Sequence, residues 1–300
     1  MPLAEFAFLW VDLELGRLVL LSSLVFVFTG PFLPERYRVG VTMQWFDTHA
    51  HLFYPPLIDQ LDEFLELARQ AGVTGMLCVG TDLASSRQSV ELAHRYPQIW
   101  AAVGIHPNEC AKAETSDWEA IVNLSRDPRV VALGETGLDR HWDDAPFDLQ
   151  QEYFQRHLDF SRESGLPFIV HMRDCESDIV AQLERQAATG ALHGVMHSFT
   201  GTPETAEKCQ QWGMYISFAG MATYKNAADI RQVSKLVRAD RILVETDAPY
   251  LTPHPHRGQR PNHSAMVIHT GQCLAEERGL AFPDFARQTT ENAQRLFNLS

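Results

Sequence analysis

Residues 130–139 have the sequence VVALGETGLD, in which a short apolar run leads directly into two acids. A continuous apolar run of this length is expected for a strand of a parallel sheet that is covered on both faces. The acids Glu135 and Asp139 follow at the end of that strand. A buried ionisable side chain without a partner is energetically costly, so this segment predicts both a parallel α/β sheet and a polar site at its edge.

Seven other short apolar runs resemble the one at 130–134, and longer amphipathic stretches separate them. In the first such stretch, apolar residues such as Leu57, Leu61 and Leu65 fall on one face of a helix. Eight strand–helix units predict a (β/α)8 TIM barrel, although periodicity alone does not distinguish it from an open doubly wound sheet. The predicted strands are 44–48, 76–80, 100–104, 130–134, 167–171, 194–198, 214–218 and 242–246, and helices are predicted after them at 264–278 and 283–297.

The composition is that of a globular, acidic protein. The 300 residues include 25 Lys and Arg against 38 Asp and Glu, which gives a formal net charge of −13, and 45% are hydrophobic. This balance argues against a protein that coats nucleic acid with a broad basic face, but it is compatible with an enzyme that holds phosphate through metal ions. The 5 cysteines are odd in number and include no CxxC pair, so we expect a reducing, cytoplasmic location.

The segment 1–42 differs from the rest of the chain. Residues 18–34 carry no charge, which allows a signal or anchor segment as one interpretation. Acidic residues precede this stretch, no cleavage site follows it, and it is short for a membrane span, so we favour translation from Met43. We therefore expect residues 1–42 to be an extra segment outside the fold, and residues 43–300 to form one barrel domain that does not associate with membranes.

Histidines and acids stand at the ends of five predicted strands. His49 and His51 are two residues apart after the first strand, so both imidazoles can point toward one metal ion. In a barrel the carboxyl ends of the strands meet at one mouth, where catalytic residues lie. Coordination would remove the cost of burying these groups, and the sequence therefore predicts six ligands: His49, His51, Glu135, His171, His197 and Asp247.

The chemistry of these ligands indicates the kind of site. All are imidazole or carboxylate groups without a thiolate, which suits Mg, Mn or Zn in a catalytic site. Six ligands exceed the number that one catalytic ion takes from a protein, so we expect two divalent ions per chain. Two-metal sites activate water for hydrolysis, above all of phosphate esters.

Ordered motifs along residues 44–299 resemble the TatD family of metal-dependent deoxyribonucleases. They are FDTHAH at 46–51, GIHP at 104–107, GETGLD at 134–139, VH at 170–171, HSFTG at 197–201, ETDAPY at 245–250 and NAQRLF at 292–297. The resemblance implies a TIM-barrel hydrolase of the amidohydrolase-like group that cuts DNA with a divalent metal. The family pattern begins a few residues after its initiator methionine, in agreement with a start at Met43, and has no counterpart of residues 1–42.

The resemblance also implies roles for the ligands. One ion would be held by His49, His51 and Asp247, and Glu135 would bridge it to a second ion completed by the histidines of the fifth and sixth strands. Asp247 is in addition the candidate general base for the attacking water, and the bridging Glu135 is the other candidate catalytic residue. Family members often act as 3′→5′ exonucleases on single strands and damaged ends, and some are linked to removal of D-amino acids from tRNA. The expected partners are DNA and, as an alternative, tRNA.

Further residues at the same rim are candidates for contact with substrate: His106, Arg173, Lys225, Arg257 and Arg260. Lys225 matches a family lysine that would meet a phosphate, and a solvated loop lysine is the alternative. Two positions depart from the family pattern. Asn108 replaces a common histidine, and Pro261 separates Arg260 from the asparagine that often follows it directly. Asp139 either holds a histidine next to the metal site or caps its loop.

Three functions remain open from the sequence. The first is a two-metal phosphodiesterase that acts on DNA. The second is a hydrolase of another bond, such as the ester of D-aminoacyl-tRNA or a cyclic amide; Glu135 disfavours amide chemistry, because binuclear amidohydrolases often have a carboxylated lysine at that strand. The third is a binding protein with a structural ion, which the open, multi-ligand site disfavours. No aromatic ladder with interleaved basic residues marks a long nucleic-acid track, so we expect local cleavage at an end.

Overall fold

The computed structural model describes residues 43–299, and the segment 1–42 lies outside this part of the chain. Eight strands form one sheet in the order in which they follow along the chain. Each pair of hydrogen-bonded neighbours is parallel. The strands are β1 (Trp45–Ala50), β2 (Val73–Val79), β3 (Ile99–Val103), β4 (Val130–Asp139), β5 (Phe168–Arg173), β6 (Gly194–Met196), β7 (Tyr215–Phe218) and β8 (Ile242–Val244).

β1 and the segment after β8 lie side by side and close the sheet into a barrel. Ala50 pairs with Ala248 in parallel. The Asp247 N–H donates to the His49 carbonyl oxygen (2.9 Å), and the His51 N–H donates to the Ala248 carbonyl oxygen (2.7 Å). The predicted TIM barrel is therefore confirmed, and the open doubly wound sheet is excluded. The same contacts bring His49, His51 and Asp247 to one point of the rim.

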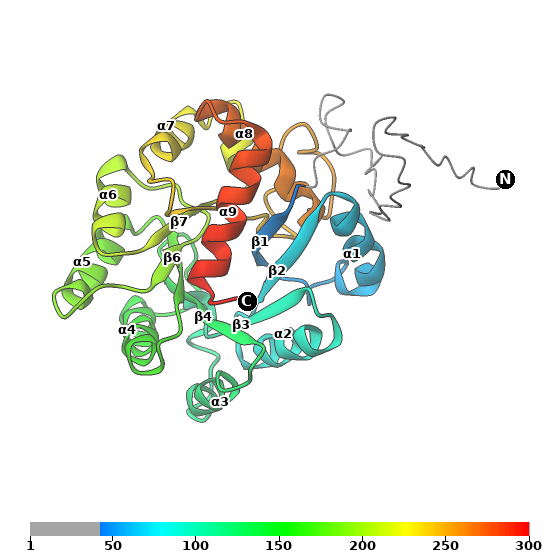
Figure 1. Cartoon of the computed structure of the whole chain (residues 1–300). Coiled ribbons are helices and arrows are strands. Elements are labelled where there is room, and N and C mark those ends of the chain that lie inside the picture. The colour runs from blue at the N-terminus through cyan, green and yellow to red at the C-terminus, as the bar shows by residue number, and fades with distance from the viewer. Residues whose placement is uncertain (1–42, 300) are drawn as a thin grey trace, which may run out of the picture.

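Helices surround the barrel, and one of them crosses its end. Figure 1 shows α1 to α7 around the strands and α9 across them, with the C-terminus near the barrel axis. Among residues 43–299, no helix has the length and apolar character needed to cross a membrane. The helices are α1 (Leu61–Gln70), α2 (Leu83–Arg95), α3 (Asp117–Leu124), α4 (Phe147–Ser164), α5 (Glu176–Ala187), α6 (Pro203–Gln211), α7 (Ala228–Leu236), α8 (Val267–Glu277) and α9 (Phe282–Leu296).

Successive residues of a strand face in turn the apolar core inside the barrel and the apolar core between the strands and the surrounding helices. In β2, Leu77 packs inside the barrel with the end of α9, whereas its neighbour Met76 packs outward among the helices. The Leu296 carbonyl oxygen at the end of α9 accepts a hydrogen bond from the His193 ring (3.2 Å), just before β6 begins. α9 therefore closes the barrel at the amino-terminal ends of the strands, and the carboxyl ends form the mouth.

Local sequence signals explain where several helices begin and end. Asp82 caps α2, because its carboxylate accepts the Ser85 N–H (2.7 Å) while the Ser85 hydroxyl accepts the Asp82 N–H (2.9 Å). Gly165, with a φ of 78°, ends α4 in the left-handed conformation that glycine adopts without strain. Such caps satisfy backbone groups that a helix leaves without intrahelical partners.

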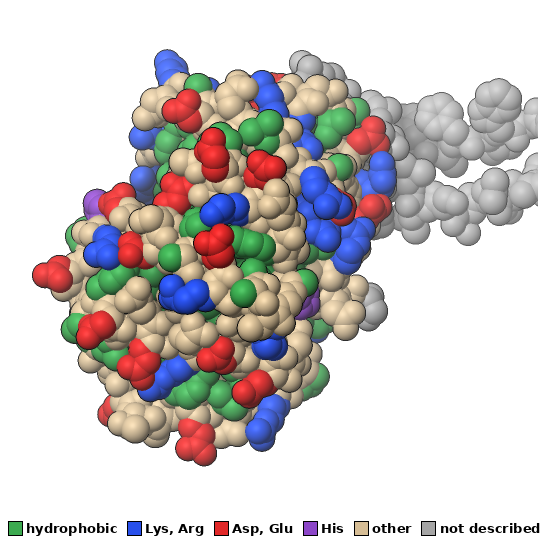
Figure 2. All heavy atoms as spheres, turned by 90° about the vertical axis from the view of Figure 1, so that its left-hand side faces the viewer, with side chains coloured by type: hydrophobic (Ala, Val, Ile, Leu, Met, Phe, Trp, Pro, Cys, Tyr) green, Lys and Arg blue, Asp and Glu red, His purple; other side chains and the backbone are tan. Residues whose placement is uncertain are grey.

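Acidic and basic side chains are interspersed over the helical surface. Figure 2 shows this for the side of the barrel that lies at the left in Figure 1, where α4, α5 and α6 are found. Ion pairs such as Lys208–Glu184 (3.4 Å) and Arg140–Asp178 (2.9 Å) link neighbouring elements there. This side offers no broad basic face to a nucleic acid.

The largest differences from the predicted bounds lie at the rim. β4 continues to Asp139, beyond the predicted end at residue 134. Gly134 and Gly137 adopt φ angles of 138° and 131°, and after an irregularity between Leu133 and Thr136 the chain is again paired with β5 up to Asp139. β6 and β8 are shorter than predicted, so the ligands that follow them lie in turns. The predicted helix at 264–278 begins as a 3-10 turn before α8, and the other bounds differ by three residues or fewer.

A buried histidine outside the mouth makes stability depend on pH. The His157 ring donates from Nδ1 to the Tyr153 carbonyl oxygen (2.7 Å) and accepts the Ile105 N–H at Nε2 (3.1 Å). Burial lowers the pKa of His157 from 6.5 to about 4. Below pH 6.5 the unfolded chain binds a proton that the folded chain excludes, so the free energy of unfolding falls as the pH drops toward 4.

We expect this histidine to account for about 2 kcal/mol of lost stability between pH 7 and pH 5. The measurement is urea unfolding of the wild type and of His157→Gln at both pH values. The variant should be less stable at pH 7 but should lose less stability on acidification. Equal losses in the two proteins would contradict the assignment.

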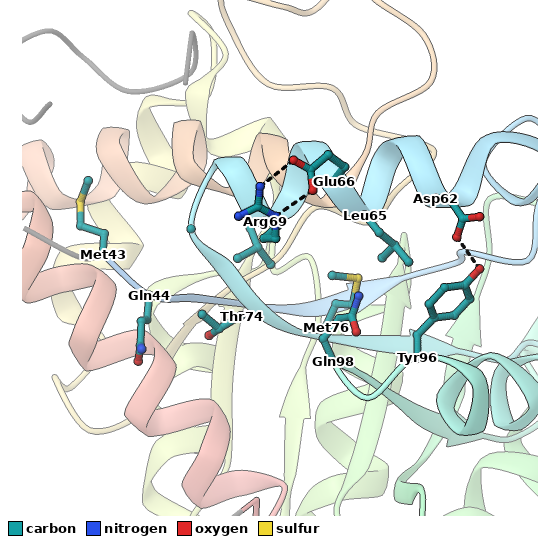
Figure 3. A pocket seen from close by; sticks show the side chains of 12 residues that line it. Met43, Gln44, Asp62, Leu65, Glu66, Arg69, Thr74, Met76, Tyr96 and Gln98 are labelled. Atoms are coloured by element: carbon teal, nitrogen blue, oxygen red, sulfur yellow. Dashed lines mark hydrogen bonds and ion pairs between the residues drawn. The ribbon is translucent and has the colours of Figure 1, made fainter. Parts of the chain in front are cut away.

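A cavity of about 560 Å³ lies between α1 and the amino-terminal ends of β1 and β2 (Figure 3). Leu65 and Met76 face it, and the ion pair between Arg69 and Glu66 (2.7 Å) lies along its edge. None of the six predicted ligands is among the described residues that line it. The cavity is at the opposite end of the barrel from the mouth, and it has no part in the site described next.

Candidate metal centre

The six predicted ligands come together at the carboxyl ends of five strands. Their side chains are buried, except that His171 and Asp247 are partly exposed to the mouth. They are His49 in β1 and His51 just after it, Glu135 in β4, His171 in β5, His197 after β6 and Asp247 after β8.

The first group of donor atoms lies between β1 and β8. The Nε2 atoms of His49 and His51 are 3.3 Å apart. Oε2 of Glu135 lies 3.4 and 3.5 Å from these two nitrogens. Oδ1 of Asp247 lies 3.8 and 3.5 Å from them. Four donor atoms from three segments of the chain therefore point at one another.

His49, His51 and Glu135 form a group whose ligand atoms, 3.3 to 3.5 Å apart, are close to the spacing of ligands of one divalent cation, and Oδ1 of Asp247 lies up to 3.8 Å from them. Ligand atoms about 2.1 Å from a metal are about 3.0 to 3.4 Å apart when its geometry is octahedral or tetrahedral. Two imidazole nitrogens at 3.3 Å need either a proton or a cation between them, and two carboxylates beside them favour positive charge. The donor set thus has the spacing and the charge that a divalent ion requires.

The other oxygen of Glu135 faces a second group of histidines. Its Oε1 lies 2.9 Å from Nδ1 of His171 and 2.9 Å from Nε2 of His197. Glu135 therefore turns one carboxylate oxygen to each of two separate histidine groups. A carboxylate in this position has the geometry of a bridge between two cation sites.

A further layer of acceptors sets the orientation and tautomer of the histidines. Nδ1–H of His51 donates to the Val79 carbonyl oxygen (2.8 Å), so Nε2 is the nitrogen that points into the first group. Nδ1–H of His197 donates to Glu245 (3.1 Å), and Nε2–H of His171 donates to Asp139 (2.9 Å). In each ring the nitrogen that faces Glu135 carries a proton or would ligate a cation in its place, as in metal sites whose histidines are held by outer hydrogen bonds.

His106 has the opposite tautomer. Its Nδ1 accepts the Asn108 N–H (3.1 Å), so in the neutral ring the proton is on Nε2, which points toward Oε1 of Glu135 (3.5 Å). A protonated nitrogen is a hydrogen-bond donor and not a ligand. His106, Glu135 and His171 also form a group whose ligand atoms lie close enough to hold a metal ion. Contact of His106 with substrate stays a prediction.

The backbone at the mouth is shaped for these contacts. A Cβ on Gly137 would collide with the carbonyl oxygen of His171, so only glycine lets β4 lie this close to β5. Ser198 and Asp247 adopt left-handed φ angles of 44° and 54°. Non-glycine residues adopt this conformation rarely, and often at functional sites. The turn at Asp247 directs its side chain back toward the histidines.

The charges in the centre shift the pKa values of its members. Burial lowers the pKa of His49 and of His106. Burial alone would also lower the pKa of His197, but the Glu135 carboxylate holds it well above its usual value. Burial alone would raise the pKa of Glu135, but His197, His106 and His49 hold it well below its usual value. Glu135 is thus ionised in the middle of the centre.

The predicted cations lie around the mouth and not within the centre. Arg173 is exposed at the end of β5, and Lys225 is exposed in the loop after β7. The Arg257 guanidinium lies 4.1 Å from the centre of the Tyr224 ring. Arg260 donates to the Thr252 hydroxyl (2.8 Å) within its own loop.

Two buried acids support the centre and were not predicted. Glu245 holds His197 and accepts the Ser198 N–H (2.7 Å). Asp47 accepts the N–H (2.9 Å) and hydroxyl (2.6 Å) of Thr246 and so ties β1 to the segment after β8. The sequence feature that could have identified Asp47 and Glu245 is the one that identified the candidate ligands, a carboxylate at the end of an apolar strand.

Asp139 performs both of the roles that the sequence left open. Its Oδ2 holds His171, and its Oδ1 accepts the N–H groups of His141 (2.7 Å) and Trp142 (3.1 Å). Asn108, at the position where a histidine is common, donates to the same Oδ2 (3.3 Å). Asn108, in place of the common histidine, therefore puts a side-chain amide next to the Asp139 carboxylate that holds His171.

Comparison with known proteins places this site in a family. The pattern of the family described as TatD-related DNase matches residues 46–298. An uncharacterized metal-dependent hydrolase of Bacillus subtilis, YabD, is 40% identical over 255 residues, covering 85% of this chain and 99% of that protein. The 3′-5′ ssDNA/RNA exonuclease TatD of Escherichia fergusonii is 33% identical over 261 residues, covering 85% of this chain and 99% of that protein.

A solved structure agrees with these matches. The crystal structure of YjjV, a TatD homolog from Escherichia coli K12, superposes with a TM-score of 0.80 at 30% identity and covers 85% of this chain and 98% of that one. The expected barrel fold is likewise confirmed. The match extends over most of both chains in each comparison. The chain therefore belongs to the TatD-related DNase family.

Proposed function

We propose that this protein is a divalent-metal-dependent hydrolase that cleaves phosphodiester bonds of single-stranded DNA from a free 3′ end. The observation that carries the proposal is Glu135, which turns one oxygen to each of two histidine groups at 2.9–3.5 Å. Two-cation centres of this kind suit displacement at a phosphate. The name of the Escherichia fergusonii relative, an exonuclease of ssDNA and RNA, supports the same substrate class.

The donor atoms would be divided between two cation sites. His49, His51 and Asp247 would hold one ion, Glu135 would contribute to both, and the second ion would be completed by the histidines of β5 and β6. Nitrogen and oxygen donors of this kind accept Mg, Mn or Zn. When bound, such ions lower the pKa of the attacking water and neutralise charge that develops on the phosphate.

The chain's own groups would handle the proton and the substrate. Burial alone would raise the pKa of Asp247, but the hydrogen bond from His51 and the charges of nearby histidines hold it below its ordinary value. Asp247 is thus ionised at the open side of the centre and can accept a proton from the attacking water. Nε2–H of His106 would donate to a phosphate oxygen, and the exposed cations Arg173, Lys225, Arg257 and Arg260 would hold neighbouring phosphates.

The experiment uses the full chain, stripped with chelator and resupplied with Mg, Mn or Zn. It is incubated with end-labelled single-stranded DNA and, separately, with D-aminoacyl-tRNA. The proposal predicts metal-dependent shortening of the DNA from its 3′ end, which Asp247→Ala abolishes. Intact DNA with deacylated tRNA would replace the proposal with ester hydrolysis. Absence of turnover on both substrates would contradict phosphodiester cleavage.

Asp139→Asn should lower metal affinity by about 10- to 100-fold. The asparagine side-chain oxygen can still accept the His141 and Trp142 N–H groups. The asparagine NH2 group, however, would take the place of the oxygen that now accepts from Nε2–H of His171. The His171 proton would then move to Nδ1, the atom that faces Glu135. The measurement is a chelator-competition titration, with the exposed Asp143→Asn as control. Unchanged affinity in Asp139→Asn would show that Asp139 does not set this tautomer.

A further inference from the structure

In the part of the chain that the structure describes, the large aromatic side chains that are well exposed follow strands β4 and β8 at the mouth of the barrel. Among residues 43–299, the large apolar side chains that are more than about a third exposed include two aromatic ones, Trp142 (53%) and Tyr250 (52%). A single exposed ring needs no explanation, because much of any protein surface is apolar. Here both rings stand next to the candidate metal centre.

Trp142 is fixed to the centre through Asp139. Oδ1 of Asp139 accepts the Trp142 N–H (3.1 Å), and Oδ2 of the same carboxylate accepts from the His171 ring (2.9 Å). The Arg173 guanidinium lies 5.6 Å from the centre of the indole ring, because Arg173 pairs with Asp139 across β4 and β5. The backbone under the indole is thus held rigidly, while the ring itself faces solvent.

Tyr250 stands beside the other histidine group. The Tyr250 N–H donates to the Asp247 carbonyl oxygen (2.9 Å), and the Asn262 side-chain amide donates to the Tyr250 carbonyl oxygen. Its ring centre is 6.3 Å from that of His51 and 6.4 Å from that of Tyr54. As with Trp142, the backbone is anchored next to a candidate ligand and the ring is exposed.

The two rings belong to opposite walls of the barrel. Trp142 follows β4 and Tyr250 follows β8, and in the closed order β1 to β8 these strands are four apart in either direction. The histidine groups, joined by Glu135, lie between the two walls. Each wall also carries a predicted cation, Arg173 beside Trp142 and Arg257 in the loop that follows Tyr250.

We propose that Trp142 and Tyr250 stack the nucleobases on the two sides of the scissile phosphate. The inference rests on the proposed function and adds how the substrate is held. Aromatic rings bind bases of any sequence through their faces. Stacking also requires no positive charge, which suits a chain with a net charge of −13 and acids next to Trp142, at Asp143 and Asp144. A dinucleotide step with both bases would be the unit that the mouth recognises.

The test measures binding and cleavage separately. Binding of a fluorescent single-stranded oligonucleotide is measured in the Asp247→Asn background at saturating metal, where cleavage should be slow and DNA binding retained. Trp142→Ala and Tyr250→Ala should each raise Kd by about 5- to 100-fold, as expected for one lost stacking contact. Trp142→Phe should restore most of the affinity, since it retains a ring. Tyr96→Ala, at the opposite end of the barrel, is the control and should bind as the parent does.

Abasic oligonucleotides identify the base that each ring contacts. With a strand that lacks the 3′-terminal base, one of the two substitutions, Trp142→Ala or Tyr250→Ala, should no longer raise Kd. With a strand that lacks the penultimate base, the other substitution should no longer raise Kd. Alanine variants that bind like the parent, or lose equal affinity for base-containing and abasic strands, would overturn the proposal. A wild type that binds through these rings without cleaving DNA would contradict the proposed function but support the stacking contacts.

Discussion

Replacing Glu135 with glutamine is expected to reduce hydrolysis by at least about 1000-fold and to lower the metal content of the purified protein. Glutamine has nearly the same shape, but one carboxylate oxygen becomes an amide that cannot ligate a cation. Because the two oxygens of Glu135 face different histidine groups, either orientation of the amide disables one group. A neutral amide is also less costly to bury than a carboxylate, so the barrel should still fold.

The measurement combines metal analysis, thermal unfolding and the single-strand cleavage assay. Glu66→Gln is the matched control, because Glu66 pairs with Arg69 on the exposed surface of α1 and should leave activity and metal content unchanged. A Glu135→Gln variant with wild-type activity and metal content would remove Glu135 from the centre.

The second large effect is expected from Asp247→Asn. If Asp247 accepts the proton of the attacking water, the substitution should reduce kcat by about 100- to 10,000-fold at saturating metal. The KM for DNA should change little, because Asp247 faces the histidines and not the exposed cations. Asp240→Asn is the control, since Asp240 forms surface ion pairs with Arg238 and Arg241.

The metal dependence of Asp247→Asn separates its two possible roles. A residue that only ligates should be replaceable by excess metal, so activity would recover as the metal concentration rises. A general base is not replaced in this way, and kcat should stay low at every metal concentration. Full recovery would therefore leave Asp247 as a ligand and contradict its assignment as the base.

The barrel, and the meeting of the six candidate ligands at its mouth, could be predicted because both depend on local sequence. A strand end places its polar residues at a common rim, and residues two apart, such as His49 and His51, lie on the same side of a strand. The structure brings all six together. β4 continues beyond its predicted end at residue 134, because pairing with β5 resumes at Thr136 and extends to Asp139.

The supporting residues could not be predicted in the same way. Asp47 contacts Thr246, 199 residues away, and Glu245 contacts His197, 48 residues away. The position of each carboxylate at a strand end indicates a polar site, but its partner follows from closure of the barrel and is not indicated by either segment alone. The exposure of Trp142 and Tyr250 likewise depends on how the loops pack, and two isolated aromatic residues do not form a ladder that a sequence pattern could reveal.

The most direct test of the account is anomalous diffraction from crystals of the full chain grown with Mn²⁺. A two-cation centre at the mouth predicts two manganese peaks, one within coordination distance of His49, His51 and Asp247 and the other beside His171 and His197, with Glu135 between them. Manganese bound only at surface acids, with no peak next to these histidines, would contradict a metal centre at the mouth of the barrel.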